Sequence, residues 1–183
     1  MCFTQTSTEP GSSFGPFTWP PNGAKYQLLD ILTHNAIANC SVMYRRAFKT
    51  IPDWVQELKF CDIPLHSLHA LQKPIGYIPE LMAVHRINKD GNFDNKPLTE
   101  RLEKSIGVYD ALAHNLPPPY RWKAYQFLTL VHLELTLAQK SPGHLRGAIQ
   151  SLRSMPMSYR AGEVGLLLRT MRRFAFNHYG RPK

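Results

Sequence analysis

The chain has 183 residues, of which 43% are hydrophobic and 19% are charged. This composition is typical of a globular protein with one core and excludes collagen, coiled coils and intrinsic disorder. The formal net charge of +9 favours anionic partners, such as phosphate groups or an acidic lipid surface. The three cysteines form no Cys-x-x-Cys pair, which argues against a disulfide framework or a structural zinc site and fits a reducing compartment.

The first half of the chain is predicted to mix loops, strands and short helices. Residues 1–24 are rich in Ser, Thr, Pro and Gly, which predicts a loop or an extended edge, and 1–4 suit either the end of a strand or a disordered start. Apolar residues recur at helical spacing over 25–34 and predict a short amphipathic helix. Small, β-branched and aromatic residues over 37–44 predict a buried strand.

A turn, a helix and two strands are predicted to follow. Residues 51–54 read as a turn, and Asp62 suits the N-cap of a helix that ends before Pro74. Residues 75–78 and 81–87 then predict two extended segments that complete a mixed sheet.

Beyond residue 97 the sequence predicts helices only. The predicted segments are a helix from Leu98 to about Leu112, a second over about 121–140, a third with Ser141 as its cap, and a fourth over about 162–178. We therefore expect an α/β domain over 1–96 and an all-helical C-terminal extension over 97–183.

Asp62 is the carboxylate of greatest chemical interest. A carboxylate at a helix N-terminus accepts backbone N–H bonds and suits the helix dipole, which is a purely structural role. The same carboxylate beside a strand end is also suited to take a proton from an attacking hydroxyl, as a general base does. Both interpretations stay open at this point.

Other polar residues lie near it in the sequence. His66 and His69 are three residues apart on the predicted helix, but together with Cys61, Asp62 and His85 they match no established zinc spacing, and no metal site is predicted. The remaining candidates are the cations Arg45, Arg46 and Arg86 near the predicted strand ends, which suit a diphosphate or are simply solvated.

Several common functions have no signature in the sequence. The phosphate-loop, dinucleotide, esterase and zinc-protease motifs are absent, as is any Asp-x-Asp. No nucleic-acid-binding motif accompanies the basic charge, and no nucleic-acid partner is expected. The last predicted helix carries Arg169, Arg172 and Arg173 and suits an anionic membrane surface, a protein partner or a solubilising role.

Five ordered blocks resemble a known family. The segments CSVMYRR, IPDW, CDIPLH, IGYIPELMAVHRIN and DGNF occur in that order between residues 40 and 93. Together they resemble the C-terminal, acceptor-side half of bacterial family 2 glycosyltransferases. The resemblance covers about residues 1–93 and implies a partial A-type glycosyltransferase fold, the nucleotide-diphospho-sugar transferase fold, with a mixed sheet.

The resemblance assigns roles by position. Asp62 takes the place of the catalytic base of an inverting transferase. Positions near the donor sugar or its diphosphate are Ser41, Arg45, Arg86 and Asn88. Positions on the acceptor side are Trp54, Ile63 and His66.

The chain departs from the family pattern at several of these positions. Ile63 stands where the family has a tryptophan that packs on the acceptor, and Asn88 stands where it has a histidine facing the diphosphate and metal. The family uses Mg²⁺ or Mn²⁺ held by an Asp-x-Asp, which this sequence lacks. We therefore expect the nucleotide-binding half to be missing and the isolated chain to transfer little sugar from UDP-sugars.

The resemblance thus implies transfer of a sugar from a nucleotide-sugar, such as a UDP-sugar, to a glycan or lipid-linked acceptor, as in cell-wall or polysaccharide biosynthesis. The alternative is a truncated, non-catalytic remnant or interaction module that keeps the fold. Because no secretory signal opens the sequence, a cytoplasmic location is expected, at most peripheral to the inner face of the membrane.

Overall fold

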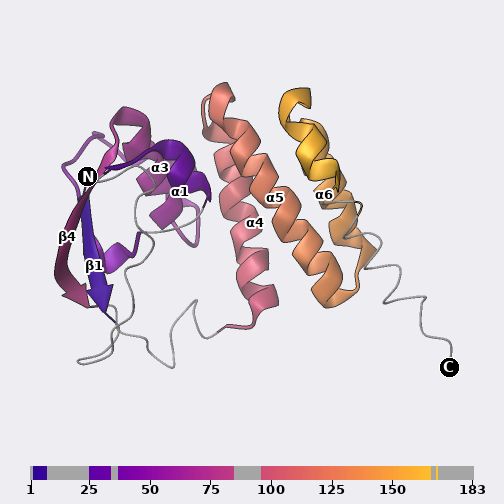
Figure 1. Ribbon diagram of the computed structural model, residues 1–183, viewed down its shortest axis with the longest axis horizontal. Helices are drawn as coiled ribbons and strands as arrows, with labels where there is room; N and C mark the ends of the chain where they lie inside the picture. Colours follow the sequence, from indigo (N-terminus) through magenta and orange to yellow (C-terminus); the bar gives the residue numbers. More distant parts are fainter. Residues whose placement is uncertain (1, 8–24, 34–36, 85–95, 166–167, 169–183) are drawn as a thin grey trace. The chain divides into compact units, whose positions relative to one another are not determined.

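The computed structural model describes residues 2–7, 25–33, 37–84, 96–165 and 168. The chain divides into two compact units, Met1–Asn95 and Lys96–Lys183. The first unit combines a small sheet with short helices, and the second consists of helices in its described part (Figure 1). A mixed α/β class therefore describes the first unit, while helices dominate the molecule. The division follows residue 95, one residue before the predicted end of the first domain.

The sheet of the first unit has four strands in the order β2-β4-β1-β3. These strands are β1 (Cys2–Ser7), β2 (Lys25–Tyr26), β3 (Val42–Met43) and β4 (Ile75–Val84). The central pair, β1 and β4, is parallel, and the short outer strands β2 and β3 are antiparallel to their neighbours. Figure 1 shows the two long strands side by side. Of the two alternatives left open for residues 1–4, the structure has the strand, which begins at Cys2 and continues to Ser7.

β4 is one strand, where the sequence predicted two segments on either side of Pro79. Thr4 pairs with Ile78, but the next residue, Gln5, pairs with Leu81, so the register shifts where Pro79 lies. Proline has no N–H to donate to a ladder, and an irregularity of this kind accommodates it. The prediction of a break was therefore wrong, and its remaining residues, 85–87, lie outside the described chain.

Residues 37–44 form little strand, contrary to the prediction. Residues Asn39–Ser41 form a 3-10 turn, η1, and only Val42 and Met43 pair in β3. The backbone N–H and the hydroxyl of Ser41 both donate to the carbonyl of Ala38, at 2.9 and 2.7 Å. Local hydrogen bonds from a serine side chain compete in this way with strand formation.

Three short helices complete the first unit: α1 (Leu28–Thr33), α2 (Asp53–Gln56) and α3 (Asp62–Gln72). The predicted helix at α3 is confirmed, and the helix predicted over 25–34 is confirmed only from Leu28, because Lys25 and Tyr26 form β2 instead. The predicted turn over 51–54 leads into α2, which begins at Asp53. The N-cap of α3 is Cys61, and Asp62 is the first helical residue, so the N-cap prediction was wrong by one position. Asp62 still lies in the first turn, where a carboxylate suits the helix dipole.

The second unit contains α4 (Leu98–Asn115), α5 (Pro118–Gln139) and α6 (Pro142–Ser154), which lie side by side in Figure 1. Residues 157–165 and 168 are also helical. The α4 and α6 predictions are confirmed, including the Ser141 cap, whose hydroxyl accepts from Gly143 N. α5 begins three residues earlier than predicted because the first turn of a helix tolerates proline.

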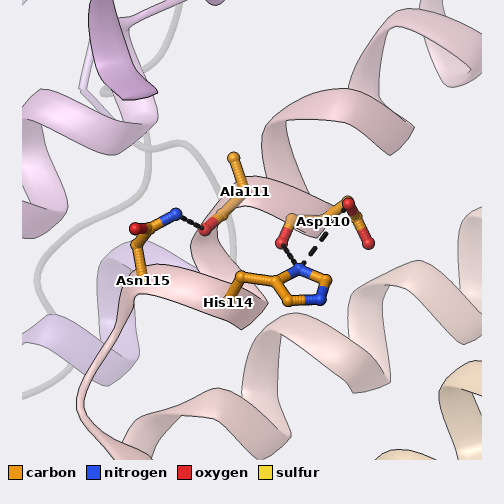
Figure 2. Close-up of polar contacts among 4 residues, drawn as sticks. All are labelled: Asp110, Ala111, His114 and Asn115. Atoms are coloured by element: carbon orange, nitrogen blue, oxygen red, sulfur yellow. Dashed lines mark hydrogen bonds and ion pairs between the residues drawn. The ribbon is translucent and has the colours of Figure 1, made fainter. Parts of the chain in front are cut away.

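Side chains satisfy the carbonyls of the last turn of α4. Nδ1 of His114 donates to the carbonyl of Asp110 at 2.8 Å and lies 3.6 Å from its carboxylate, and the amide of Asn115 donates to the carbonyl of Ala111 at 2.9 Å (Figure 2). The last carbonyls of a helix have few partners within it, so such bonds stabilise the end of α4. Leu116 then leaves the helix and is buried.

Aromatic contacts and one close approach join the helices of the second unit. The rings of Tyr109 and Phe127 stack with centroids 3.9 Å apart, which joins α4 to α5. On the other side of α5, Gly147 of α6 lies against His132, so that an added Cβ would come within 2.6 Å of the ring. Gly147 therefore allows α5 and α6 to approach closely.

A hydrogen-bonded chain of polar side chains also crosses this unit. Nδ1 of His132 lies 3.3 Å from Nδ1 of His144, and Nε2 of His144 lies 3.2 Å from Oε1 of Gln139. The amide of Gln139 in turn donates to Glu103 at 2.5 Å. Burial is the main cause that lowers the pKa of His132, and the nearby His144 lowers it further, while Asp110 acts in the opposite direction.

No described helix is both long and apolar enough to cross a membrane.

Candidate functional site

The concave surface of the first unit lies where residues 43–51 pass beside α3. Two adjoining hollows occur there, with volumes of about 450 and 690 Å³. We call them the Phe48 hollow and the Lys73 hollow, after a residue that lines only one of them. They share four lining residues: Tyr44, Arg46, Ala47 and His69.

His69 lies between two aromatic rings at the centre of this surface. Its ring centroid lies 4.8 Å from that of Tyr44 and 4.9 Å from that of Phe48, both in tilted orientations. The histidine comes from the third turn of α3, and both aromatic residues come from the segment after β3. Burial lowers the pKa of His69, which favours the neutral ring at neutral pH.

Arg46 stabilises the loop in which it lies, because two of its guanidinium nitrogens donate to carbonyls of that loop. Its Nε donates to the carbonyl of Phe48 at 3.0 Å, and its Nη2 donates to the carbonyl of Lys49. These two bonds curl residues 46–49 and place Phe48 beside His69. The sequence suggested Arg46 as a cation for diphosphate or as a solvated side chain, so its structural role was not anticipated.

The described residues that line the two hollows include cations and no carboxylate. Arg45 and Lys73 line the Lys73 hollow, Lys49 lines the Phe48 hollow, and Arg46 lines both. Among the described residues, no Asp or Glu lines either hollow. Cations gathered around a concave surface raise the local concentration of anions, and guanidinium groups suit phosphate oxygens in particular.

Sequence reasoning missed two of these cations. Lys49 follows Arg45 and Arg46 closely enough that a basic run was visible in the sequence. Lys73 is the C-cap of α3, about thirty residues away, and only the packing of α3 against the loop places it beside Arg45.

Asp62 lies at the other end of α3 from Lys73. It is half-buried and does not line either hollow. Its carboxylate acts electrostatically on His66, one turn further along the helix. Burial lowers the pKa of His66 to about 4, although the carboxylate of Asp62 and the backbone of Ile37 oppose the shift.

The other predicted site residues are spread over the first unit. Ser41 is buried and its hydroxyl is bonded to Ala38, while Trp54 and Ile63 are half-buried on α2 and α3. His66 is 3% exposed, and neither of its ring nitrogens makes a hydrogen bond of good geometry with the described residues, although the backbone of Ile37 is close enough to raise its pKa. An acceptor would reach this ring only after its neighbours moved. Arg86 and Asn88 lie outside the described residues.

Metal ligands do not converge in the part of the chain that the structure describes. No group of three or more His, Cys, Asp or Glu side chains there is placed to hold an ion. Cys40 and Cys61 are exposed free thiols. Of the five residues considered for zinc, His85 lies outside the described chain.

Comparisons with known proteins identify no relative. No family model matches the chain, and no curated protein or solved structure shows significant similarity to it. The function is therefore inferred from the residues and geometry of this chain alone.

Proposed function

We propose that the first unit is the acceptor-side part of an inverting family 2 glycosyltransferase with a partial A-type fold, and that its two hollows receive the phosphate groups of the nucleotide-sugar. The observation that carries the proposal is a surface that is lined by Arg45, Arg46, Lys49 and Lys73 and has no carboxylate among its described lining residues. The five ordered sequence blocks carry the resemblance to this family, and the mixed sheet with a parallel central pair is compatible with it.

The reaction assigned to the complete enzyme is an in-line displacement. Asp62 takes the proton from a hydroxyl of a glycan or lipid-linked acceptor, the resulting oxygen attacks the sugar carbon, and the nucleoside diphosphate leaves with the bonding electrons. Arg45 and its neighbouring cations stabilise the charge that develops on the leaving diphosphate. An Mg²⁺ or Mn²⁺ ion would assist from ligands that this sequence does not supply.

Phosphate binding is testable on the chain as it stands. We expect inorganic pyrophosphate to bind with a Kd of about 1 mM at low salt, without added metal, because the cations are exposed and screened. The double variant Arg45→Ala, Lys49→Ala should weaken this binding at least about tenfold by isothermal titration calorimetry. Arg153→Ala, which removes an exposed cation from the second unit, is the matched control and should bind normally.

Pyrophosphate binding that is equally weakened by Arg153→Ala would mean that net charge, not the two hollows, attracts the anion. Absence of binding at low salt would remove the phosphate-binding part of the proposal. Micromolar, metal-dependent UDP binding would instead contradict the expectation that the donor-binding half is missing.

The role of Asp62 is tested separately. When a donor-binding half is supplied as a fusion, Asp62→Asn should lower kcat by at least about 100-fold with little change in donor KM, because the amide cannot accept the proton. Asp53→Asn, at the start of α2, is the control carboxylate and should leave kcat within about twofold. Unchanged turnover in Asp62→Asn would remove it from the mechanism.

Two observations favour a second candidate, a non-catalytic interaction module. Asp62 lines neither hollow, and Ile63 replaces the ring on which an acceptor would pack. Such a module would bind phosphorylated ligands at the hollows without transferring a sugar. Normal pyrophosphate binding together with no turnover in the completed enzyme is the result that supports it.

A further inference from the structure

His69 lines both hollows of the first unit. It is 7% exposed, and its ring lies between the rings of Tyr44 and Phe48, so packing fixes its position beside the hollows. Histidine is the side chain whose charge changes most readily near neutral pH. A change in the charge of this ring would therefore act on an anion in either hollow.

The surroundings of His69 disfavour a positive charge on its ring unless an anion is bound. Burial is the main cause that lowers the pKa of His69, and the charge of the amino terminus lowers it further. The described charged residues that line the hollows are all cations: Arg45, Arg46, Lys49 and Lys73. A protonated ring would add to their positive charge rather than balance it. Without an anion, the ring of His69 is therefore neutral at about pH 7.

The other titratable groups of α3 and of the helix packed against it do not balance a charge on His69. His66 lies one turn earlier on α3, and burial lowers its pKa to about 4, so it stays neutral above about pH 5.5. Asp62 lies in the first turn of α3, and Asp30 of α1 accepts a hydrogen bond from N of Gln27. Neither carboxylate is among the described residues that line the hollows, so a bound anion is the group that could stabilise the imidazolium there.

We propose that His69 takes up a proton when a phosphate group binds in the hollows and becomes a charged ligand of that group. The inference rests on the proposed phosphate-binding site and adds a residue that no step of the proposed function uses. The negative charge of the ligand offsets the surrounding cations and favours the imidazolium, whose N–H groups donate to anion oxygens.

Proton uptake makes the affinity for the anion depend on pH. The ring is neutral in the free chain and charged in the complex, so the anion raises the pKa of His69 above its value in the free chain. Affinity therefore rises as the pH falls through the pKa of the complex, and it levels off below the pKa of the free chain, where both states are protonated.

Sulfate titrations of the full chain at low salt test the proposal. Sulfate has the shape and charge of a phosphate group but stays doubly charged over the range used, so any pH dependence comes from the protein. We expect the association constant from isothermal titration calorimetry to rise at least about fivefold from about pH 7 to about pH 5.5, because a positive charge is added beside the ligand. Repeating the titration in buffers of different ionisation enthalpy should show proton uptake on binding, a measurement that needs no variant.

The variant His69→Gln removes the titrating ring but keeps the four cations and the amino terminus. It should bind sulfate within about threefold of the parent chain at about pH 7 and lose the rise at lower pH. His114→Gln replaces an exposed histidine of the second unit and is the matched control that should keep the rise. Circular dichroism at both pH values checks that the variants are folded.

The possible failures of the two proposals are distinguishable. Sulfate binding without proton uptake, or an undiminished rise in His69→Gln, would overturn the role of His69 while leaving the phosphate site in place. Absence of sulfate binding at either pH would remove the phosphate site and the role of His69 together.

Discussion

The two units differ in where their stabilising contacts lie along the sequence. In the second unit α4 packs on α5 and α5 on α6, so each helix contacts the next one along the chain. In the first unit the central strand pair joins β1 to β4, with Phe3 opposite Tyr77. Local contacts leave a periodic signal in the sequence, whereas pairing between distant strands leaves a much weaker one.

Two buried hydroxyls of the second unit and two buried side chains on α3 of the first unit differ in how they are satisfied, although Nε of Arg160 in the second unit is also buried without a partner among the described residues. In the second unit the buried hydroxyls of Thr129 and Thr136 donate to the carbonyls four residues earlier, at 2.9 and 2.7 Å. In the first unit the ring of His66 and the hydroxyl of Ser67 are buried without hydrogen-bond partners among the described residues. Unsatisfied buried groups lower stability and often mark functional regions. Here they lie on α3, which also carries Asp62 and His69.

The largest predicted effect is a pH dependence confined to the first unit. Burial lowers the pKa of His66 from 6.5 to about 4, so the folded state holds this ring neutral while the unfolded state gains a proton below about pH 6.5. Stability is therefore fully present above pH 6.5 and falls by about 3 kcal/mol as the pH falls to about 4. Hydrogen exchange of α3 and β4 peptides, measured by mass spectrometry, should report the loss.

The variant His66→Phe removes the titrating group while keeping a flat ring, and it should flatten this pH dependence. His114→Phe replaces an exposed histidine of the second unit and is the control that should not. Exchange in the α5 peptides should change less with pH, because His132 is only half-buried and Asp110 opposes its shift. Equal pH dependence in His66→Phe and the parent chain would contradict this origin.

A smaller effect sharpens the description of the second unit. Gly147→Ala would place a methyl group against the ring of His132, and we expect the free energy of unfolding to fall by about 1 kcal/mol despite the higher helix propensity of alanine. Gly107→Ala on α4 meets nothing within 4 Å and should instead raise it by about 0.5–1 kcal/mol. Urea denaturation of the full chain measures both.

Both variants add the same methyl group to a helix, so the opposite signs of their changes in the free energy of unfolding report the different surroundings of the two glycines. If both variants were stabilised by similar amounts, the close approach of α5 and α6 at Gly147 would be wrong. If both variants were destabilised, the open environment of Gly107 would be wrong.

The sequence predicted much of the secondary structure and little of the site geometry. Ser141 followed by Pro142 marked the start of α6 because the cap and the proline act within one turn. The strand predicted over 37–44 was largely wrong. β-branched and aromatic residues favour a strand, but the Ser41 hydroxyl bonds locally and closes a 3-10 turn. The break predicted at Pro79 was wrong because the register shift that accommodates this proline depends on β1, which is distant in the sequence.

By itself, the sequence determined the helical character of the second unit, the basic charge and the candidate role of Asp62, because these depend on residue type and local spacing. Only the tertiary structure brought Lys73 beside Arg45, placed His69 between Tyr44 and Phe48, and left Asp62 outside both hollows. These arrangements arise where α3 packs against the loop after β3. No local pattern encodes a contact between segments that are separated by some thirty residues.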